Sequence, residues 1–289
     1  MTKLATFEAG LGPEVGIVTD EGMLPLSRLR PALASSMVQA IEQWNCLKLE
    51  LPRLTAQSHA LNMSELRLLA PIARPGKLLA IGLNYKDHIQ ESGLPTPAHQ
   101  LWFSKQPTSV NPPFDAIEIP LVSHTVDYEA ELVVVIGAKG RHISKERAEQ
   151  YIFGYCCGND VSVREWQRFT PQWMLGKSFD THAPFGPWIV TADEVGDPHV
   201  LDIRCAVNGE TRQQSNTRQL LFDVFAQIEH LSMAMTLEPG DLIFTGTPGG
   251  VGAAMKPPRY LRAGDRVRVE IERLGAIEAS LVDEARPEC

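Results

Sequence analysis

Hydrophobic residues along most of this chain form short runs, separated by turns rich in glycine and proline. Apolar runs of about four to eight residues between such turns are typical of buried β-strands. After residue 77 we expect strands at Leu78–Gly82, Glu131–Ile136, Tyr155–Asn159, Trp188–Thr191, Asp202–Val207, Leu242–Thr245 and Arg266–Ile271. These runs do not alternate regularly with helical segments, which favours a β-rich α+β body or a β-sandwich over a doubly wound parallel sheet.

Helical spacing of apolar residues occurs in two places. A helix is predicted over residues 220–235, where one face carries Leu221, Phe225, Ile228 and Leu231. A second helix is predicted near the N-terminus, with Pro31 in its first turn and apolar residues at Leu33, Met37, Ile41 and Trp44.

Prolines and glycine in Pro71–Gly76 interrupt the chain before it becomes β-rich. We therefore expect a small N-terminal α+β domain over residues 1–72, with short strands near residues 4–7 and 15–19. A catalytic domain is expected over residues 73–289.

Composition narrows the range of partners. The chain has 289 residues, 44% of them hydrophobic and 21% charged, with a formal net charge of −8, which is ordinary for a globular protein with a sizeable core. There is no cluster of Lys and Arg of the kind that neutralises phosphates, so nucleic acid is not an expected partner. An anionic substrate would need local cations.

The N-terminus lacks the apolar core of a signal peptide, and no apolar stretch is long enough to span a bilayer. We expect a cytoplasmic protein without a membrane partner. The cysteines are odd in number and lack Cys-x-x-Cys spacing, so we expect reduced thiols, mostly packed in the core, at Cys46, Cys156, Cys157, Cys205 and Cys289.

Two carboxylates lie one residue apart where a buried strand begins. In Asp127-Tyr-Glu129-Ala-Glu131, followed by Leu-Val-Val-Val-Ile, strand alternation points Glu129 and Glu131 to the same face. Burying uncompensated charge costs several kcal/mol or more. The pair must therefore share a proton, contact cations or bind a metal ion.

A third carboxylate, Asp160, follows the strand that contains the paired cysteines. Together with Glu129 and Glu131 it would supply oxygen ligands without thiolate or imidazole, a set that selects Mg²⁺ or Mn²⁺ over zinc. The alternative is that the Glu-x-Glu pair lies on an ordinary solvated strand face.

Polar residues at three further places could complete the site. Lys177 lies in an apolar segment, and its ammonium could offset the charge of the carboxylates or hold a bound enolate or carboxylate. Arg164 and Gln167 follow Asp160 at helix-like offsets and could reach back toward it. Each of these side chains, taken alone, is also compatible with an exposed position.

His88 and Glu91 would lie on one face of a helix if this segment is helical, so the carboxylate could orient the imidazole and raise its basicity. Such a pair can activate water as a general base, although the spacing alone favours a surface His near a surface Glu. The prolines and glycine of residues 93–97 give this stretch the character of a lid.

The segment 245–252, Thr-Gly-Thr-Pro-Gly-Gly-Val-Gly, is a glycine-rich loop after a strand. No Lys-Ser/Thr pair follows it, which argues against a nucleotide-binding loop. A loop whose backbone and Thr247 hydroxyl approach a small anion fits better.

Taken together, and in this order, these segments resemble the fumarylacetoacetate hydrolase family over roughly residues 77–283. The motifs that carry the resemblance are Gly82-Leu-Asn-Tyr-x-x-His88-x-x-Glu91, Phe103-Ser-Lys105, Asp127-Tyr-Glu129-Ala-Glu131-Leu, Gly158-Asn-Asp160-Val-Ser-x-Arg164-x-x-Gln167, Gly176-Lys177-Ser-Phe-Asp-Thr and Thr245-Gly-Thr-Pro-x-Gly-Val-Gly252. Each motif is weak alone, whereas the ordered set is specific.

The resemblance implies a mixed β-roll catalytic domain, usually dimeric, with Mg²⁺ or Mn²⁺ on Glu129, Glu131 and Asp160. It further implies that His88 and Glu91 form a lid dyad and that Lys177 is catalytic. It assigns contacts with the substrate or its water to Lys105, Arg164, Gln167 and Thr247.

The reaction expected first is metal-dependent cleavage of a carbon–carbon bond in a small 2,4-diketo acid such as an acylpyruvate. It would pass through an enolate stabilised by the metal, with water activated by His88 and Glu91. Decarboxylation of oxaloacetate or a related acid, and isomerisation or tautomerisation of an unsaturated 2-oxo dicarboxylate in aromatic catabolism, are the enzymatic alternatives. A metal-binding scaffold without catalysis is the remaining one.

Overall fold

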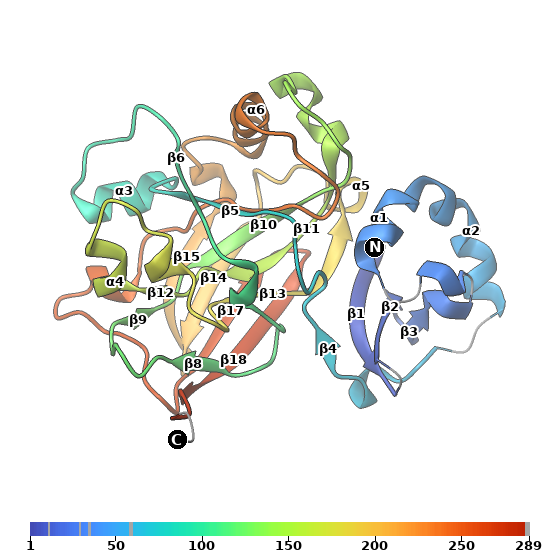
Figure 1. The fold of residues 1–289 in the computed structure, drawn as a ribbon, viewed down its shortest axis with the longest axis horizontal. Helices are drawn as coiled ribbons and strands as arrows, with labels where there is room; N and C mark the ends of the chain where they lie inside the picture. Colours follow the sequence, from blue (N-terminus) through green and yellow to red (C-terminus); the bar gives the residue numbers. More distant parts are fainter. Residues whose placement is uncertain (11, 29, 34–35, 58–59, 287–289) are drawn as a thin grey trace.

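Two β-sheets packed face to face form the body of the protein (Figure 1). The computed structural model describes residues 1–10, 12–28, 30–33, 36–57 and 60–286. The larger sheet has the order β3 (Gly22–Pro25), β2 (Gly12–Thr19), β1 (Lys3–Ala9), β13 (Ala183–Thr191), β11 (Ile152–Asn159), β10 (Ala130–Ile136), β16 (Leu242–Phe244), β5 (Leu78–Gly82) and β6 (Leu101–Ser104), with β4 (Leu68–Leu69) on β1 and β7 (Val110–Asn111) on β13.

The smaller sheet has the order β15 (Glu210–Asn216), β14 (Asp202–Val207), β17 (Arg266–Ile271), β18 (Gly275–Asp283) and β8 (Ile117–Ile119). A separate two-stranded ladder joins β9 (Val126–Asp127) and β12 (Ser162–Val163).

The α-helices are α1 (Met37–Glu42), α2 (Trp44–Gln57), α3 (Lys86–Ser92), α4 (Arg164–Arg168), α5 (Ala192–Val195) and α6 (Val224–Ala234). The 3-10 helices are η1 (Leu26–Arg28), η2 (Pro31–Leu33), η3 (Met63–Glu65), η4 (Pro107–Ser109), η5 (Lys145–Tyr151), η6 (Leu175–Lys177), η7 (Thr217–Gln219) and η8 (Gly252–Ala254).

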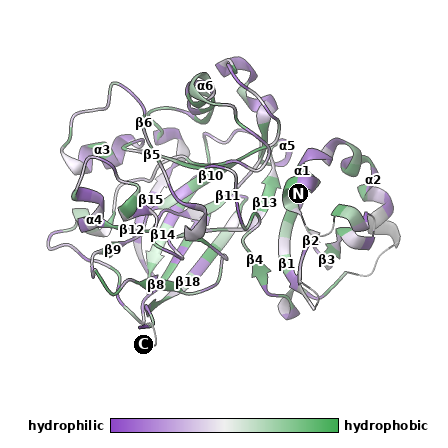
Figure 2. Ribbon diagram, viewed as in Figure 1, coloured by the Kyte–Doolittle hydropathy of each residue, from purple (hydrophilic) through white to green (hydrophobic). Residues whose placement is uncertain are grey.

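The central strands β10 and β11 are buried along their whole length, because both faces of the larger sheet are covered. Val134 and Cys157 belong to the core between the two sheets. Their neighbours Val133 and Cys156 belong to the core on the opposite face, which also contains residues of α1 and α2. Because both faces of these two strands are buried, both faces carry hydrophobic residues. Figure 2 shows the hydrophobic colour along the central strands.

The predicted mixed α+β, β-rich sandwich is confirmed. Each predicted strand is present, and β5, β14 and β17 have the predicted bounds. The short or polar strands β6, β8, β15 and β18 were not predicted, because they lack a long apolar run.

The structure corrects both helix predictions. The helix predicted over residues 220–235 begins only at Val224, because the Asp223 side chain caps it by accepting a hydrogen bond from the Ala226 N–H at 2.8 Å. The single helix predicted after Pro31 is wrong. Pro31 and Leu33 form the short η2, Ser36 then caps α1, and Trp44 begins α2.

The N-terminal strands continue the larger sheet, because β1 pairs antiparallel with β13 through Lys3 opposite Val190 and Leu4 opposite Ile189. The domain boundary near residue 72 stays a prediction. Cys46, Cys156, Cys157 and Cys205 are free thiols, and Cys46 is exposed while the other three are buried. Cys289 lies outside the described residues. Within the described part of the chain, none of the helices combines the length and apolar character needed to cross a bilayer.

Candidate active site

Glu129, Glu131 and Asp160 converge at one end of the β10–β11 pair. Antiparallel pairing sets Ala130 opposite Asn159 and Glu131 opposite Gly158, so the residues that flank the two strands meet. The Asp160 N–H donates to the Glu129 carbonyl at 2.9 Å. Ligand oxygens of the three carboxylates lie within 4.8 Å of one another, and all three side chains are buried.

Buried cations contact two of these carboxylates. The Lys177 ammonium donates to Glu129 and to Asp160, at 2.7 Å each. Arg164 Nη1 lies 2.6 Å from Glu129, and Lys105 Nζ lies 2.6 Å from Asp160. Burial alone would raise the pKa of Glu129, but Lys177 and Arg164 together lower it to about 2. Glu129 is therefore ionised at neutral pH.

Glu131 has a different environment. Its Oε2 accepts a hydrogen bond from the Gly246 N–H at 2.7 Å, and among the described residues no cationic side chain lies within salt-bridge distance of it. Burial, reinforced by the neighbouring charges of Asp160 and Glu129, raises its pKa well above the ordinary value. The three cations of the cluster thus contact Glu129 and Asp160 and leave Glu131 without a cationic partner.

A hard divalent cation fits this cluster. It would take up the charge that burial and the two neighbours make unfavourable on Glu131, and carboxylate oxygens are the ligands that Mg²⁺ and Mn²⁺ prefer. Of the three solutions open to the Glu129–Glu131 pair, contact with cations accounts for Glu129, and a bound metal ion would account for an ionised Glu131.

Arg164 reaches the cluster because α4 begins directly after β12. Its Nε donates to Asp127 at 2.8 Å and its Nη1 donates to Gln167 Oε1 at 3.0 Å. Asp127, which is fully buried, also accepts hydrogen bonds from the Gly252 and Ala253 N–H groups at 2.8 and 2.9 Å. Asp127 therefore ties Arg164 to the glycine-rich loop, a role that the sequence did not predict.

Lys177 is placed by close packing of η6 on α4. A Cβ atom at Gly176 would lie 2.3 Å from the backbone nitrogen of Gln167, so a larger residue here would push the two segments apart. Lys177 is 2% exposed, and its ammonium also lies 5.0 Å from the centre of the Phe103 ring. Although burial would lower the pKa of Lys177, Asp160 and Glu129 raise it, so the ammonium stays charged.

Lys105 is also fully enclosed. Besides Asp160, its ammonium contacts the Val161 carbonyl at 3.2 Å. Burial lowers the pKa of Lys105, while Asp160 acts in the opposite direction. The structure thus places Lys105 against a proposed metal ligand, and its predicted contact with the substrate stays a prediction.

The His88–Glu91 segment is helical, as the pairing requires. Both residues lie on α3, with His88 Nδ1 3.4 Å from Glu91 Oε2. The Glu91 carboxylate also accepts from the Gly250 N–H at 3.0 Å, and Asp87 accepts from the Gly249 N–H at 3.3 Å and from the Ser215 hydroxyl. These contacts hold α3 on the glycine-rich loop.

Thr247 lies in the glycine-rich loop and is buried. Its hydroxyl oxygen accepts a hydrogen bond from Gln213 Nε2 at 2.8 Å. Gln213, on β15, is 1% exposed and had no place in the sequence motifs. An isolated glutamine in a polar strand gives no sequence signal of this contact.

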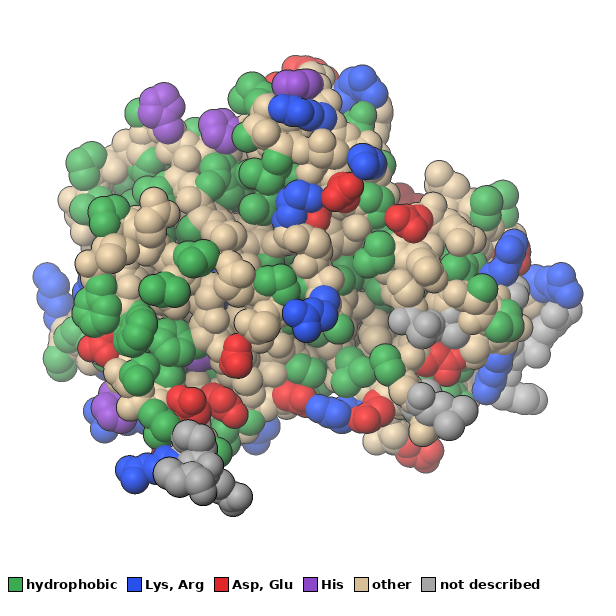
Figure 3. All heavy atoms as spheres, in the orientation of Figure 1, with side chains coloured by type: hydrophobic (Ala, Val, Ile, Leu, Met, Phe, Trp, Pro, Cys, Tyr) green, Lys and Arg blue, Asp and Glu red, His purple; other side chains and the backbone are tan. Residues whose placement is uncertain are grey.

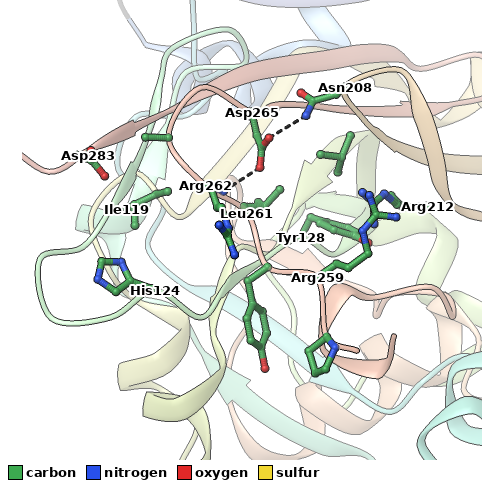
Figure 4. Close-up of a pocket in the computed structure, with 14 residues that line it drawn as sticks. Ile119, His124, Tyr128, Asn208, Arg212, Arg259, Leu261, Arg262, Asp265 and Asp283 are labelled. Carbon is green, nitrogen blue, oxygen red and sulfur yellow. Dashed lines mark hydrogen bonds between the residues drawn. The ribbon is translucent and has the colours of Figure 1, made fainter. Parts of the chain in front are cut away.

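A cavity of about 710 Å³ is lined in part by residues 258–263 (Figure 4). Arg212, Arg259 and Tyr128 line it, and the Tyr128 hydroxyl donates to the Gly250 carbonyl at 3.0 Å. Glu129, Glu131 and Asp160 are not among its lining residues.

Exposed hydrophobic side chains follow the active-site segment α4. Phe169, Met174 and Leu175 are exposed by 66%, 37% and 58%. Figure 3 shows hydrophobic side chains gathered on the left of the molecule, the side on which Figure 1 places α4. The predicted homodimer stays a prediction.

Comparison with known proteins identifies the family. Residues 77–282 match the family model described as fumarylacetoacetate (FAA) hydrolase, C-terminal. The chain belongs to the fumarylacetoacetate hydrolase family, whose members are enzymes.

Three relatives illustrate the range of reactions. The chain is 44% identical over 272 residues to the human mitochondrial oxaloacetate tautomerase FAHD2A, covering 92% of this chain and 87% of that protein. It is 30% identical, with a TM-score of 0.83, to maleylpyruvate hydrolase from Sphingobium sp. SYK-6 in complex with manganese(II) and pyruvate, covering 98% and 100%. It is 29% identical, with a TM-score of 0.77, to 2-hydroxyhepta-2,4-diene-1,7-dioate isomerase from Mycobacterium marinum, covering 99% and 100%.

Proposed function

We propose that this protein is a divalent-metal-dependent enzyme that interconverts the keto and enol forms of a small 2-oxo dicarboxylic acid of the oxaloacetate type. The observation that carries the proposal is the buried group of Glu129, Glu131 and Asp160, together with the His88–Glu91 pair on α3, which the glycine-rich loop holds in place. The 44% identity with an oxaloacetate tautomerase supports this reaction over the others.

The residues present fit Mg²⁺ or Mn²⁺, which Glu129, Glu131 and Asp160 would hold. When bound, the cation would polarise the 2-oxo group of the substrate and stabilise negative charge on its oxygen. Lys177 adds a fixed positive charge at the same place, since its ammonium already contacts Glu129 and Asp160.

Tautomerisation moves one proton from the carbon beside the 2-oxo group to oxygen, and no bond between heavy atoms breaks. With Nδ1–H directed at Glu91, the His88 imidazole presents its Nε2 lone pair as the base that takes the carbon-bound proton. Glu91, fixed by the Gly250 N–H, holds the ring in this tautomer and stabilises the imidazolium that forms, until the imidazolium gives the proton to the 2-oxo oxygen and the enol is complete.

Hydrolysis of an acylpyruvate is the second candidate, and it is the reaction we expected first from the sequence. It is favoured by the fold similarity to a maleylpyruvate hydrolase and by the same His88–Glu91 pair, which would take a proton from water instead of carbon. The two reactions need the same enolate stabilisation and differ in what His88 deprotonates.

The test supplies purified protein with Mg²⁺ or Mn²⁺ and offers oxaloacetate, acetylpyruvate and maleylpyruvate. Enol absorbance reports tautomerisation, mass spectrometry identifies cleavage products, and metal without protein gives the background. We expect oxaloacetate tautomerisation to exceed background and to fall about 10²- to 10⁴-fold in His88→Ala, but not in Gln90→Ala on the exposed side of α3.

Release of pyruvate from the diketo acids without tautomerisation would favour the second candidate. No turnover of any of these acids would reject both. A cytoplasmic location stays a prediction as well, because the human relative is named mitochondrial.

A further inference from the structure

Gln213 is fixed by hydrogen bonds at both ends of its amide. Its Oε1 accepts from the Ala130 N–H at 2.9 Å, between the proposed metal ligands Glu129 and Glu131. Its Nε2 donates to the Pro248 carbonyl at 2.8 Å and to the Thr247 hydroxyl oxygen at 2.8 Å. The amide cannot be reversed, since a backbone N–H only donates and a carbonyl only accepts.

This arrangement decides the direction of the Thr247 hydroxyl proton. Because Gln213 Nε2 donates to Thr247 Oγ1, the hydroxyl must use its own proton toward a different acceptor. Among the described residues, the Thr247 hydroxyl has this one hydrogen bond, in which it accepts, and no acceptor within hydrogen-bond distance takes its proton. Thr247 is buried, and a buried donor without an acceptor is unfavourable unless a ligand supplies one.

The flanking residues of the loop place Thr247 at the active site. The preceding Gly246 N–H donates to Glu131, and the following Gly249 and Gly250 N–H groups contact Asp87 and Glu91 of α3. Thr247 therefore lies between a proposed metal ligand and the helix that carries the proposed base.

We propose that Gln213 is a positioning residue for substrate binding: it makes the Thr247 hydroxyl an obligatory hydrogen-bond donor, directed at a carboxylate of the 2-oxo acid. This inference rests on the proposed function, since it takes the same site and the same class of substrate. This role explains why the neutral amide of Gln213, which accepts at one end and donates at the other, lies at a buried position beside the carboxylate cluster.

The backbone gives Gln213 this position. Gly250 has φ +101°, and a Cβ atom there would lie 2.0 Å from the Arg212 carbonyl oxygen. The glycine-rich loop can thus pack directly on β15, which brings the Gln213 amide within reach of Thr247 and Pro248.

The decisive variant is Gln213→Glu, which has the same shape but replaces the donating NH₂ by an oxygen. The Thr247 hydroxyl would then donate to the new carboxyl group instead of the substrate. We expect KM to rise about 10- to 100-fold with kcat within a few-fold of wild type, because a bond to the unreacting carboxylate is equal in ground and transition states.

Gln214→Glu is the matched control, since it introduces the same group at the next, exposed residue of β15 and should leave both constants unchanged. If Gln213→Glu does not fold, Gln213→Met removes the donor without adding charge. Its KM should then rise about three- to tenfold, because the hydroxyl loses the donor that orients it, and a wild-type KM in a folded Gln213→Met would overturn the proposal.

A binding measurement separates this role from a structural one. With Mg²⁺ present, the Kd of pyruvate, measured by calorimetry, should rise by a factor similar to that in KM. In a Thr247→Val background, Gln213→Glu should change Kd by less than about twofold, because the two side chains act through one contact. An undiminished effect in that background, or a loss confined to kcat and melting temperature, would assign Gln213 to structure alone.

The outcome for wild type distinguishes the two proposals. A wild-type enzyme that turns over 2-oxo acids, with Gln213→Glu unchanged in KM and Kd, overturns only the role of Gln213. A wild-type protein that neither binds pyruvate nor turns over any 2-oxo acid overturns both.

Discussion

Replacing Lys177 with methionine should destabilise the metal-free protein strongly. The ammonium is 2% exposed and contacts both Glu129 and Asp160 at 2.7 Å, so its removal leaves two buried carboxylates short of a partner. Breaking a buried ion pair by removing one member costs about 3–5 kcal/mol. An unfolding entropy of about 2.1 cal/mol/K per residue converts this, over 289 residues, to a fall in Tm of roughly 5–8 °C.

The assay is thermal unfolding at neutral pH with a chelator present. Lys145→Met is the matched control, because it removes an ion pair with Asp223 whose side chains are 45% and 35% exposed. Such a surface pair contributes about 0–1 kcal/mol, or less than roughly 2 °C here. Equal losses of Tm in the two variants would refute the conclusion that Lys177 neutralises the carboxylate cluster.

Three further outcomes are expected. Asp160→Asn should abolish both turnover and the rise in Tm that Mg²⁺ gives wild type; an Mg²⁺-dependent rise that survives would contradict the metal assignment. Asp87→Asn should weaken the contact of α3 with the loop, lowering kcat/KM about 3- to 30-fold and speeding amide exchange in α3, and unchanged exchange would exclude this role. Burial lowers the pKa of His182 to about 3, so the folded state resists protonation of this side chain. The contribution of His182 to the free energy of unfolding is therefore present above its ordinary pKa of about 6.5 and falls by about 2 kcal/mol between pH 7 and 5. This part of the pH-dependent loss of stability should be missing in His182→Gln.

Much of the fold could be predicted from local sequence patterns. Strand β10 has a continuous apolar run because both of its faces are buried, and β17 alternates polar and apolar residues because one of its faces is buried. Edge strand β15 and the two-residue strands have no such pattern, so they were missed. The helix after Pro31 was predicted wrongly because apolar spacing does not register the cap at Ser36 that starts a new helix.

The candidate site, like the fold, could be predicted only in part. The residue types at 129, 131 and 160 predicted a hard cation, and helical spacing predicted the His88–Glu91 contact, which the structure contains at 3.4 Å. Asp127 and Gln213 were not predicted. Their partners are the backbone of the glycine-rich loop and the hydroxyl of Thr247, which are distant in sequence and come together only when the sheets pack.

The sequence by itself determined the chemistry available to this protein, because carboxylate spacing, the His–Glu interval and the ordered family motifs are local properties of the chain. Only the tertiary structure decided how the charges are distributed among these groups. Glu129 and Asp160 receive buried cations from α4, η6 and β6–η4, whereas Glu131 receives a single backbone N–H. That asymmetry arises from which segments the two sheets bring together, and our proposal of a divalent cation at the cluster rests on it.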